Sequence, residues 1–405
     1  VINTFRLRGS YGTVGNIGGI GDFASYSQYD ARLYNGNSAL YFYQLGNSNL
    51  TWETSKKTDI GLQFGLLNDL ITGDLAWYRN NVDGLIIYVP QSGSTGIPYP
   101  DHNLSIPTNI GSMYNKGFEI TLNARPINSQ DFRWNTSFNI TFNSNKVTAL
   151  APGVPNITYT TSSLEQTSIT LPGYSIGTIY VLPTAGVDPA TGRRIFVNAA
   201  GQQLGYDHAT RKYYDVKTGA VATSIDPAKD KRPMYNAVPK YYGGFSNDFR
   251  YHDFDLGILI SYEGGFYVYN GTQASIRDNR FWNSSVDVLR RWTQAGQVTD
   301  IPKIMYGDNV SNGSANPISA NVQKGDFIKL RNVSLGYTLP ARLVQKAGIS
   351  NARVYVSGQN LAIITKYKGP DPETSTNGND PQGQGIDRNS VANGRVLTVG
   401  LNIGF

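Results

Sequence analysis

The chain has 405 residues, a net charge of +6, 27 Tyr and no Cys, and only 16% of its residues are charged. The absence of Cys excludes disulfides and Cys-ligated sites, and the many aromatic residues argue against a disordered chain. The longest apolar run, residues 85–89, stops at Pro90 and is far shorter than the about 20 residues of a membrane-spanning helix. The densest basic run, residues 229–232, contains its own acid, Asp230, which predicts a solvated turn and no nucleic-acid partner.

Apolar and polar residues alternate with a period of two along the whole chain, which predicts β-strands. We place ten strands at residues 5–11, 51–66, 71–88, 113–125, 132–144, 241–251, 254–268, 327–339, 353–361 and 396–405. Most are longer than the about 5–6 residues of a soluble strand. Their length suits a transmembrane strand, which needs about 9–11 residues when tilted.

The connections between these strands alternate in length. Long connections cover residues 12–50, 89–112, 145–240, 269–326 and 362–395, whereas 67–70, 126–131 and 252–253 are short and 340–352 is intermediate. Outer-membrane barrels have this pattern, with long extracellular loops and short periplasmic turns. Aromatic residues near strand ends fit interfacial girdles: Tyr88, Tyr241, Tyr242 and Tyr267. The predicted fold class is all-β, a transmembrane antiparallel β-barrel of which this chain holds ten to twelve strands.

Local patterns inside the connections predict smaller elements. A further strand pair is expected from residues 177–182 and 194–198, and short helices from 286–291 and 341–347. Gly12 and Gly15 follow the first strand without a helix pattern, which indicates a flexible loop entry instead of a phosphate cradle. The Gly- and Asn-rich stretch 377–385 reads as a mobile loop tip.

No residue pattern supports catalysis. His102, His208 and His252 are far apart in sequence, and each falls in or near a predicted loop or turn. The chain has no helical His pair for zinc, nucleophile elbow or P-loop motif. We therefore predict that the protein is not an enzyme, with no catalytic residues and no cofactor.

Four acidic residues near the C-terminus are the candidates for a metal site. Asp371, Glu373, Asp380 and Asp387 could offer oxygen ligands to Ca²⁺, but their spacing does not match an EF-hand loop. The favoured interpretation is a polar exposed loop without metal.

Aromatic residues crowd the connection 12–50, and two interpretations stay open. These residues are Tyr26, Tyr29, Tyr34, Tyr41, Phe42 and Tyr43. Tyr rings can stack on sugars or hold peptides through a flat apolar face and a hydroxyl, so they are candidate ligand-binding residues. The alternative is that they pack the loop against its neighbours.

The last strand carries a further candidate signal. Its apolar positions form one face and end the chain on an aromatic residue: Leu397, Val399, Leu401, Ile403 and Phe405. We predict that this pattern is the signal recognised by the barrel-assembly machinery, since barrel closure must pair the last strand with the first. An ordinary last strand is the alternative.

Several short stretches form a recognisable set. In chain order they are R-G-S-Y-G-T-V-G-N from Arg8, L-T-W-E from Leu50 with D-I-G-L from Asp59, N-I-G from Asn109 with N-K-G-F-E from Asn115, G-V-D-P-A-T-G from Gly186, D-F-I-K-L-R-N-V-S-L-G-Y from Asp326, S-G-Q-N-L from Ser357 and G-P-D-P-E from Gly369. These stretches resemble, in family order, those of the SusC/RagA-type TonB-dependent outer-membrane transporters. Each is weak alone, but together they span nearly the whole chain.

The resemblance implies a barrel of about 22 strands with a plug inside it. Residues 1–405 would be the C-terminal portion of that barrel, without the plug domain and the early strands. The chain opens at Val1, without Met, and half a barrel would leave two bare edges in lipid, so we expect it to be part of a longer protein.

The function implied is TonB-dependent active import of a large nutrient, a glycan or an oligopeptide. The implied partners are a SusD-like surface lipoprotein, TonB-ExbB-ExbD through the missing N-terminal part, and outer-membrane lipid. The first alternative is a passive porin or a surface-binding outer-membrane barrel. The second is a secreted glycan-binding module or glycosidase, which would be water-soluble.

Overall fold

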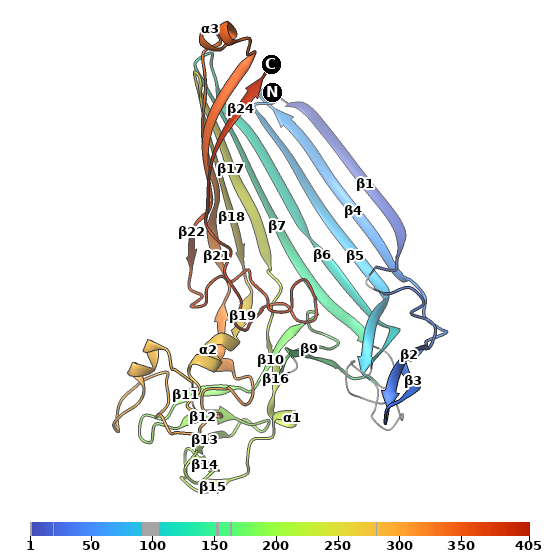
Figure 1. Ribbon diagram of the computed structural model, residues 1–405, viewed down its shortest axis with the longest axis vertical. Coiled ribbons are helices and arrows are strands. Elements are labelled where there is room, and N and C mark those ends of the chain that lie inside the picture. Colours follow the sequence, from blue (N-terminus) through green and yellow to red (C-terminus); the bar gives the residue numbers. More distant parts are fainter. Residues whose placement is uncertain (1, 19, 91–104, 151–153, 163, 281) are drawn as a thin grey trace.

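The computed structural model describes residues 2–18, 20–90, 105–150, 154–162, 164–280 and 282–405. Three of its features organise the chain: a long antiparallel sheet, a loop module at one end of that sheet, and a separate hairpin (Figure 1). His102 lies outside the described residues.

All ten predicted strands are present, and they form one antiparallel sheet in chain order. The strands are β1 (Ile2–Asn16), β4 (Glu53–Leu66), β5 (Ile71–Pro90), β6 (Ser105–Asn128), β7 (Phe132–Leu150), β17 (Tyr241–Tyr251), β18 (Phe254–Gly264), β21 (Phe327–Thr338), β22 (Asn351–Thr365) and β24 (Val396–Gly404). Strands β1 and β24 are its two edges. In Figure 1 the sheet is seen face-on from β1 to β7 and nearly edge-on from β17 to β22, so it curves about its long axis.

Two predicted boundaries were wrong for local reasons. Strand β1 continues through Gly12 and Gly15 to Asn16, because it stays paired with β4 over its whole length, so these glycines do not open a flexible loop. The predicted strand 254–268 ends at Gly264. Gly265 has a φ of +76°, which breaks the extended conformation before the separate strand β19 (Tyr267–Asn270).

The connections sort by length to opposite ends of the sheet, as predicted. At the short-turn end, strands are joined through residues 67–70, 129–131, 252–253 and 339–350. The last of these holds α3 (Ala341–Val344) and the 3-10 turn η4 (Gln345–Ala347), in the place of the predicted helix 341–347. The long connections lie at the other end, the long-loop end (Figure 1). No helix in the described part of the chain is long and apolar enough to cross a membrane.

The strand register sorts the side chains into an apolar face and a polar face. One row across the sheet reads Leu7, Leu62, Leu75, Ile120, Ile140, and another reads Leu256, Leu335, Val356, Val399. Many of these side chains are exposed, including Leu7 at 71% and Val399 at 75%. Apolar groups on the outside of a sheet are stable when lipid surrounds them.

The long connections after β7, β18 and β22 fold together into the loop module, which comprises residues 154–240, 265–326 and 366–395. Its elements are β8 (Ile157–Thr161), β9 (Glu165–Thr170), β10 (Thr178–Val181), β11 (Thr184–Val187), β12 (Arg194–Val197), β13 (Gln203–Asp207), β14 (Lys212–Asp215), β15 (Val221–Ala222), α1 (Pro227–Asp230), β16 (Arg232–Tyr235), β19, α2 (Gly271–Ile276), η2 (Val286–Arg290), η3 (Ser319–Asn321), β20 (Val322–Lys324) and β23 (Ile386–Asp387). Strands β19, β20 and β23 form one small sheet. Strands β19 and β20 come from the beginning and the end of the β18–β21 connection, and β23 comes from the β22–β24 connection.

The predicted strand pair inside the first of these connections exists only as separate strands. Strand β10 pairs with β9 and β16, whereas β12 pairs with β11 and β13 in another sheet. The basic run 229–232 is not a solvated turn either, because Asp230 and Lys231 are buried. The predicted helix 286–291 is the 3-10 turn η2.

The loop module has an ordinary apolar core. Leu182, Phe196, Leu204 and Ile318 pack in one cluster, and Ile179, Tyr269 and Ile386 are fully buried in another. Tyr267 packs beside this second cluster. The prediction that Tyr267 belongs to an interfacial girdle was therefore wrong. Tyr241 and Tyr242 begin β17 at the long-loop end, where a girdle would lie.

Candidate functional site

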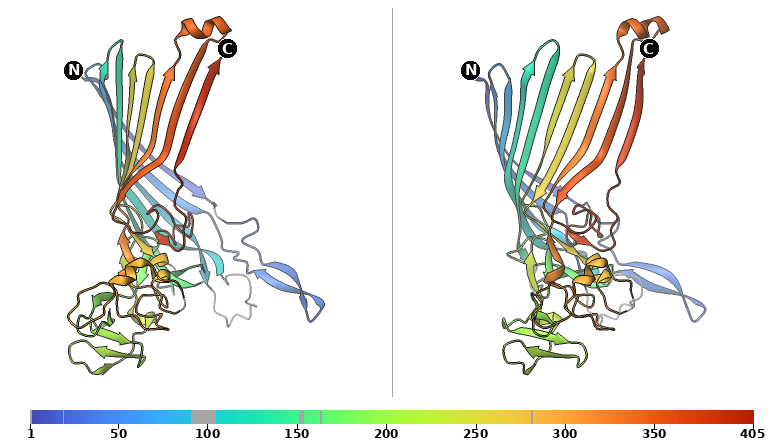
Figure 2. Two further views of the ribbon diagram at one scale, coloured as in Figure 1. Left: turned by 60° about the vertical axis from the view of Figure 1, so that its left-hand side comes forward. Right: turned by 90° about the vertical axis from the view of Figure 1, so that its left-hand side faces the viewer.

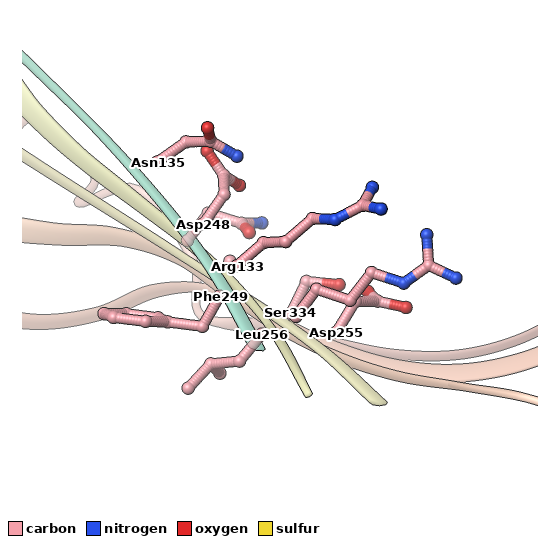
Figure 3. A pocket seen from close by; sticks show the side chains of 10 residues that line it. Arg133, Asn135, Asp248, Phe249, Asp255, Leu256 and Ser334 are labelled. Atoms are coloured by element: carbon pink, nitrogen blue, oxygen red, sulfur yellow. The ribbon is translucent and has the colours of Figure 1, made fainter. Parts of the chain in front are cut away.

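A hollow of about 470 Å³ opens on the polar face near the short-turn end of β7, β17, β18 and β21. Figure 3 shows Arg133, Asn135, Asp248, Asp255 and Ser334 pointing to one side of the strands. Phe249 and Leu256 point to the other side. The alternation predicted from sequence therefore produces a polar wall with charged side chains of both signs.

Two arginine–carboxylate clusters link strands on this wall. Arg353 donates to both carboxylate oxygens of Asp255, at 2.8 and 2.5 Å. The guanidinium passes over Gly336 on the strand between them, where a Cβ atom would come within 2.3 Å of it. Arg8 pairs in the same way with Asp59 at 3.3 Å and with Asp74.

Two charges in the hollow remain available. The side chains of Arg133 and Asp248 make no hydrogen bond or ion pair with any other described residue. The hollow can therefore offer a guanidinium and a carboxylate to a polar molecule or to another protein segment, while Arg353 and Asp255 satisfy each other.

The loop module covers the polar-face side of the sheet at the long-loop end. Val82, Ile87 and Val147 of the strands pack against Ile157 and Ile176 of the module. At the next contact along the sheet, Phe327 of β21 packs with Phe266 and Tyr367. Folded chain therefore covers the polar face at the long-loop end. The hollow at the short-turn end takes no part in these contacts.

A buried ion cluster fixes the module to strand β21. Lys329, whose side chain is 4% exposed, donates to Asp371 at 2.8 Å and to Glu373. Arg331 pairs with the other oxygen of Glu373 and donates to Ser261 of β18 at 2.7 Å. Two stretches that are 42 residues apart in sequence, around Lys329 and around Asp371, thus meet as partners.

A second cluster joins the three connections of the module to one another. Asp387 is fully buried and accepts hydrogen bonds from Tyr367 at 2.5 Å and from Thr272 at 3.3 Å. Arg388 pairs with the buried Glu165 of β9 at 2.6 Å. Burial raises the pKa of Glu165, and the neighbouring Arg388 opposes that rise. Burial and Asp387 also raise the pKa of Tyr367, so its hydroxyl stays a donor.

These contacts correct the prediction for the four acidic residues. Asp371 and Asp387 are buried and hydrogen-bonded, so the loop that carries them is not the polar exposed loop that was expected. The predicted mobile tip is also anchored, because Asn377 donates to Thr161 at 3.0 Å. Within the described residues, no three His, Asp or Glu side chains gather closely enough to hold a metal ion.

Arg194 is a buried cation that has no carboxylate partner in the described chain. Its guanidinium donates to the backbone oxygens of Ser311 and Asp300, both at 2.9 Å. Burial lowers its pKa to about 10, and Arg277 nearby adds to that effect. Arg194 thereby ties the first connection of the module to the second.

The six aromatic candidates lie on or beside one hairpin, β2 (Gln28–Tyr34) and β3 (Asn37–Gln44). Figure 2 shows this hairpin projecting away from the loop module. Tyr29 and Phe42 stack across it with ring centroids 4.5 Å apart, and Arg32 lies over the ring of Tyr41. Tyr26, Tyr34 and Tyr43 are exposed. The structure therefore gathers the aromatic residues but keeps them outside the hollow.

The proposed insertion signal lies on the edge strand β24. Leu397, Val399, Leu401 and Ile403 occupy its apolar face, and Phe405, just beyond the strand, is 93% exposed. Strand β24 pairs with β22 on one side only. Its free edge is the edge that a further strand would need in order to close a barrel.

Each of the two described His residues lies near a carboxylate. His208 lies 3.9 Å from the buried Asp308, and His252 occupies the short turn after β17, 3.6 Å from Asp131. The hollow and the ion clusters were missed by sequence reasoning, although one signal was present. Charged residues occupy polar-face positions of the strands among mostly uncharged neighbours, as Arg133, Asp255, Lys329 and Arg353 do.

Comparison with known proteins identifies the family. The sequence model of the family described as TonB dependent receptor-like, β-barrel, matches residues 1–361. TonB-dependent receptor P3 of Formosa agariphila is 30% identical over 367 residues, which cover 89% of this chain and 35% of that protein. TonB-dependent receptor SusC of Bacteroides thetaiotaomicron is 27% identical over 378 residues, which cover 89% of this chain and 32% of SusC.

A solved structure of the RagAB peptide transporter is similar over the whole chain. The TM-score is 0.80 at 25% identity, with 100% of this chain and 41% of that chain covered. The sheet, its two faces and these matches define an outer-membrane β-barrel segment. The chain belongs to the TonB-dependent receptor family and is of the SusC/RagA type. This is a family of transporters and receptors, and the chain spans about a third of the length of these curated relatives.

Proposed function

We propose that the protein of which this chain forms part imports a large nutrient, a glycan or an oligopeptide, actively across the outer membrane. The observation that carries the proposal is the charged polar wall beneath a folded loop module. Such a wall suits the passage of a hydrated polar molecule, and the cap suits a gated route better than an open pore. The similar RagAB structure is that of a peptide transporter, which supports an oligopeptide as substrate.

The same proposal assigns the parts that lie beyond these strands. Residues 1–405 would be the C-terminal portion of one barrel, and a plug domain would fill the lumen. Energy would come from TonB-ExbB-ExbD, contacted through that missing part, and a SusD-like lipoprotein would cover the long-loop end. The barrel-assembly machinery would recognise the apolar face of β24 and Phe405.

Uptake by cells that express the full-length protein tests the proposal. We expect accumulation of a fluorescent oligopeptide or oligosaccharide to stop when the proton gradient is collapsed or TonB is deleted. Uptake that continues unchanged in both conditions would reject active import and favour the passive porin.

The aromatic hairpin offers a test of the partner and ligand contacts. We propose that Tyr26, Tyr29, Tyr34, Tyr41, Phe42 and Tyr43 bind substrate or the lipoprotein lid. Replacing residues 28–44 by a short Gly-Ser linker removes the hairpin and leaves the module contacts intact. We expect co-purification of the lid or substrate affinity to fall. If both are unchanged, the hairpin has no binding role.

A further inference from the structure

The apolar face changes character at its long-loop end. An aromatic row closes the apolar belt there, and its members are Trp77, Phe118, Phe142 and Tyr241. The next row outward reads Thr58, Arg79, Lys116, Ser144, and the following one reads Lys56, Asn81, Tyr114, Lys146. Four cations thus lie on four adjacent strands, on the same face as the apolar belt and immediately beyond it.

Contacts among these residues hold two of the cations together. The guanidinium carbon of Arg79 lies 5.4 Å from the centre of the Tyr114 ring, and Nζ of Lys116 lies 5.3 Å from it. Arg79 also donates to Asn81 at 3.0 Å. A shared aromatic ring can keep two like charges close, because each is attracted to the ring face.

The positive charge of this cluster is largely uncompensated. Lys56 pairs with Asp83 at 3.0 Å. Arg79, Lys116 and Lys146 are exposed and have no carboxylate partner among the described residues. Three free cations so close together favour an anion with more than one negative charge.

At the opposite end, the apolar face of β7, β17, β18 and β21 ends in the aromatic row Phe132, Tyr251, Phe254, Tyr337, which contains no cation. The distance from Phe132 to Phe142 is about 33 Å along the strand, or about 25 Å across the membrane at a tilt of about 40°. That is the height of a lipid-facing belt, so the cations lie at the level of the headgroups of one leaflet only. Long loops face the cell exterior, which makes it the outer leaflet.

We propose that Arg79, Lys116 and Lys146, with Lys56 at the margin, bind the phosphate groups of a phosphorylated glycolipid of the outer leaflet, of the lipid A type. Clusters of Lys and Arg at a membrane surface attract anionic headgroups. The ligand is a lipid and not a free anion, because the cations lie on the lipid-facing side of the sheet, directly above Trp77 and Phe118. The inference depends on the barrel's location in the outer membrane and not on the proposed import.

Binding of diphosphoryl lipid A to the full-length protein in detergent micelles tests this site. The triple variant Arg79→Gln/Lys116→Gln/Lys146→Gln removes the free cations. The matched control, Arg6→Gln/Lys57→Gln/Lys217→Gln, removes the same charge from exposed positions on the polar face of the sheet and on the loop module. Native mass spectrometry should show binding at least about tenfold weaker for the first variant, and within about twofold of wild type for the control. Equal loss in both variants, or in neither, would overturn the proposal.

Two further measurements separate the sources of binding. Dephosphorylated lipid A should bind the wild type as weakly as diphosphoryl lipid A binds the triple variant, and equally tight binding would reject phosphate recognition. Inorganic phosphate should not displace the lipid, and displacement at millimolar phosphate would indicate an adventitious ion only. Lys146→Gln alone should weaken binding about threefold. It should leave folding unchanged, because the side chain is exposed and makes no hydrogen bond or ion pair with a described residue.

Discussion

The transmembrane sheet and the loop module place their apolar side chains and their ion pairs in opposite environments. The sheet exposes its apolar side chains and holds the pair Arg353–Asp255 on the polar face, where both side chains are partly open to solvent. The module buries its apolar side chains and, with them, the pairs Lys329–Asp371 and Arg388–Glu165. Losing one partner should therefore matter far more in the module, because a buried charge left alone cannot be hydrated.

The largest effect is expected at the cluster that anchors the module to the sheet. Lys329→Met leaves the buried Asp371 without its cation and Glu373 with Arg331 alone. We expect a loss of about 3–5 kcal/mol in unfolding free energy. Thermal unfolding of the full-length protein in detergent measures it, with Lys324→Met, at an exposed lysine of β20, as the control. A stability equal to wild type would mean that the cluster does not hold the module.

The next effect depends on pH. Arg388→Met leaves Glu165 buried without its partner, at a cost of about 3 kcal/mol near neutral pH. Burial already raises the pKa of Glu165 above its usual 4.5, so this carboxyl group takes up a proton at a higher pH in the folded state than in the unfolded state. As the pH falls through that raised pKa, Glu165 becomes neutral and needs no cation.

The stability difference between Arg388→Met and wild type should therefore shrink on acidification. Unfolding followed by Trp fluorescence from pH 8 down to pH 4 measures that difference. A gap that stays constant over this range would show that the destabilisation has another cause, such as lost packing of the Arg388 stem.

Substitutions at two neighbouring residues of β21 allow the two faces of the sheet to be compared directly. Leu335 lies on the apolar face and Ser334 lines the polar hollow. We expect Leu335→Arg to cost about 2–4 kcal/mol and to reduce the amount of folded barrel in membranes. Ser334→Arg should cost far less. Heat-modifiable gel migration measures the folded fraction, and equal losses would contradict the assignment of the faces.

The smallest effect is expected for the pair on the polar wall. Arg353→Gln removes a two-pronged pair from Asp255, but both side chains are partly exposed, at 28% and 38%. We expect a change of at most about 1 kcal/mol, and a smaller one at high salt. A loss of unfolding free energy as large as that of Lys329→Met would show that this wall is as poorly hydrated as the interior of the module.

Prediction from sequence succeeded where one periodicity acts over many residues. The ten strands, the two faces and the sorting of the connections all follow from the alternation of apolar and polar residues. It failed inside the long connections, where strands β10 and β12 are only four residues long. Segments this short take their partners from distant parts of the chain, so their pairing has no local signal.

The candidate site divides in the same way. The aromatic residues of the 12–50 connection could be identified from sequence because they are close together there, and they do share one hairpin. The acidic residues Asp371 and Asp387 could not be interpreted, because their partners Lys329 and Tyr367 come from other strands and loops. Without those partners, a polar loop was the natural expectation.

The sequence by itself determined that this chain is a transmembrane β-barrel segment, because alternation with a period of two fixes which side chains meet lipid and which meet water. It also determined which end carries the long loops. Only the tertiary structure decided that three of those loops fold into one module and that the hollow contains two unpaired charges. It also decided that four cations from β4, β5, β6 and β7 stand together above the apolar belt. The physical reason is that register and loop packing depend on contacts between residues far apart in the chain.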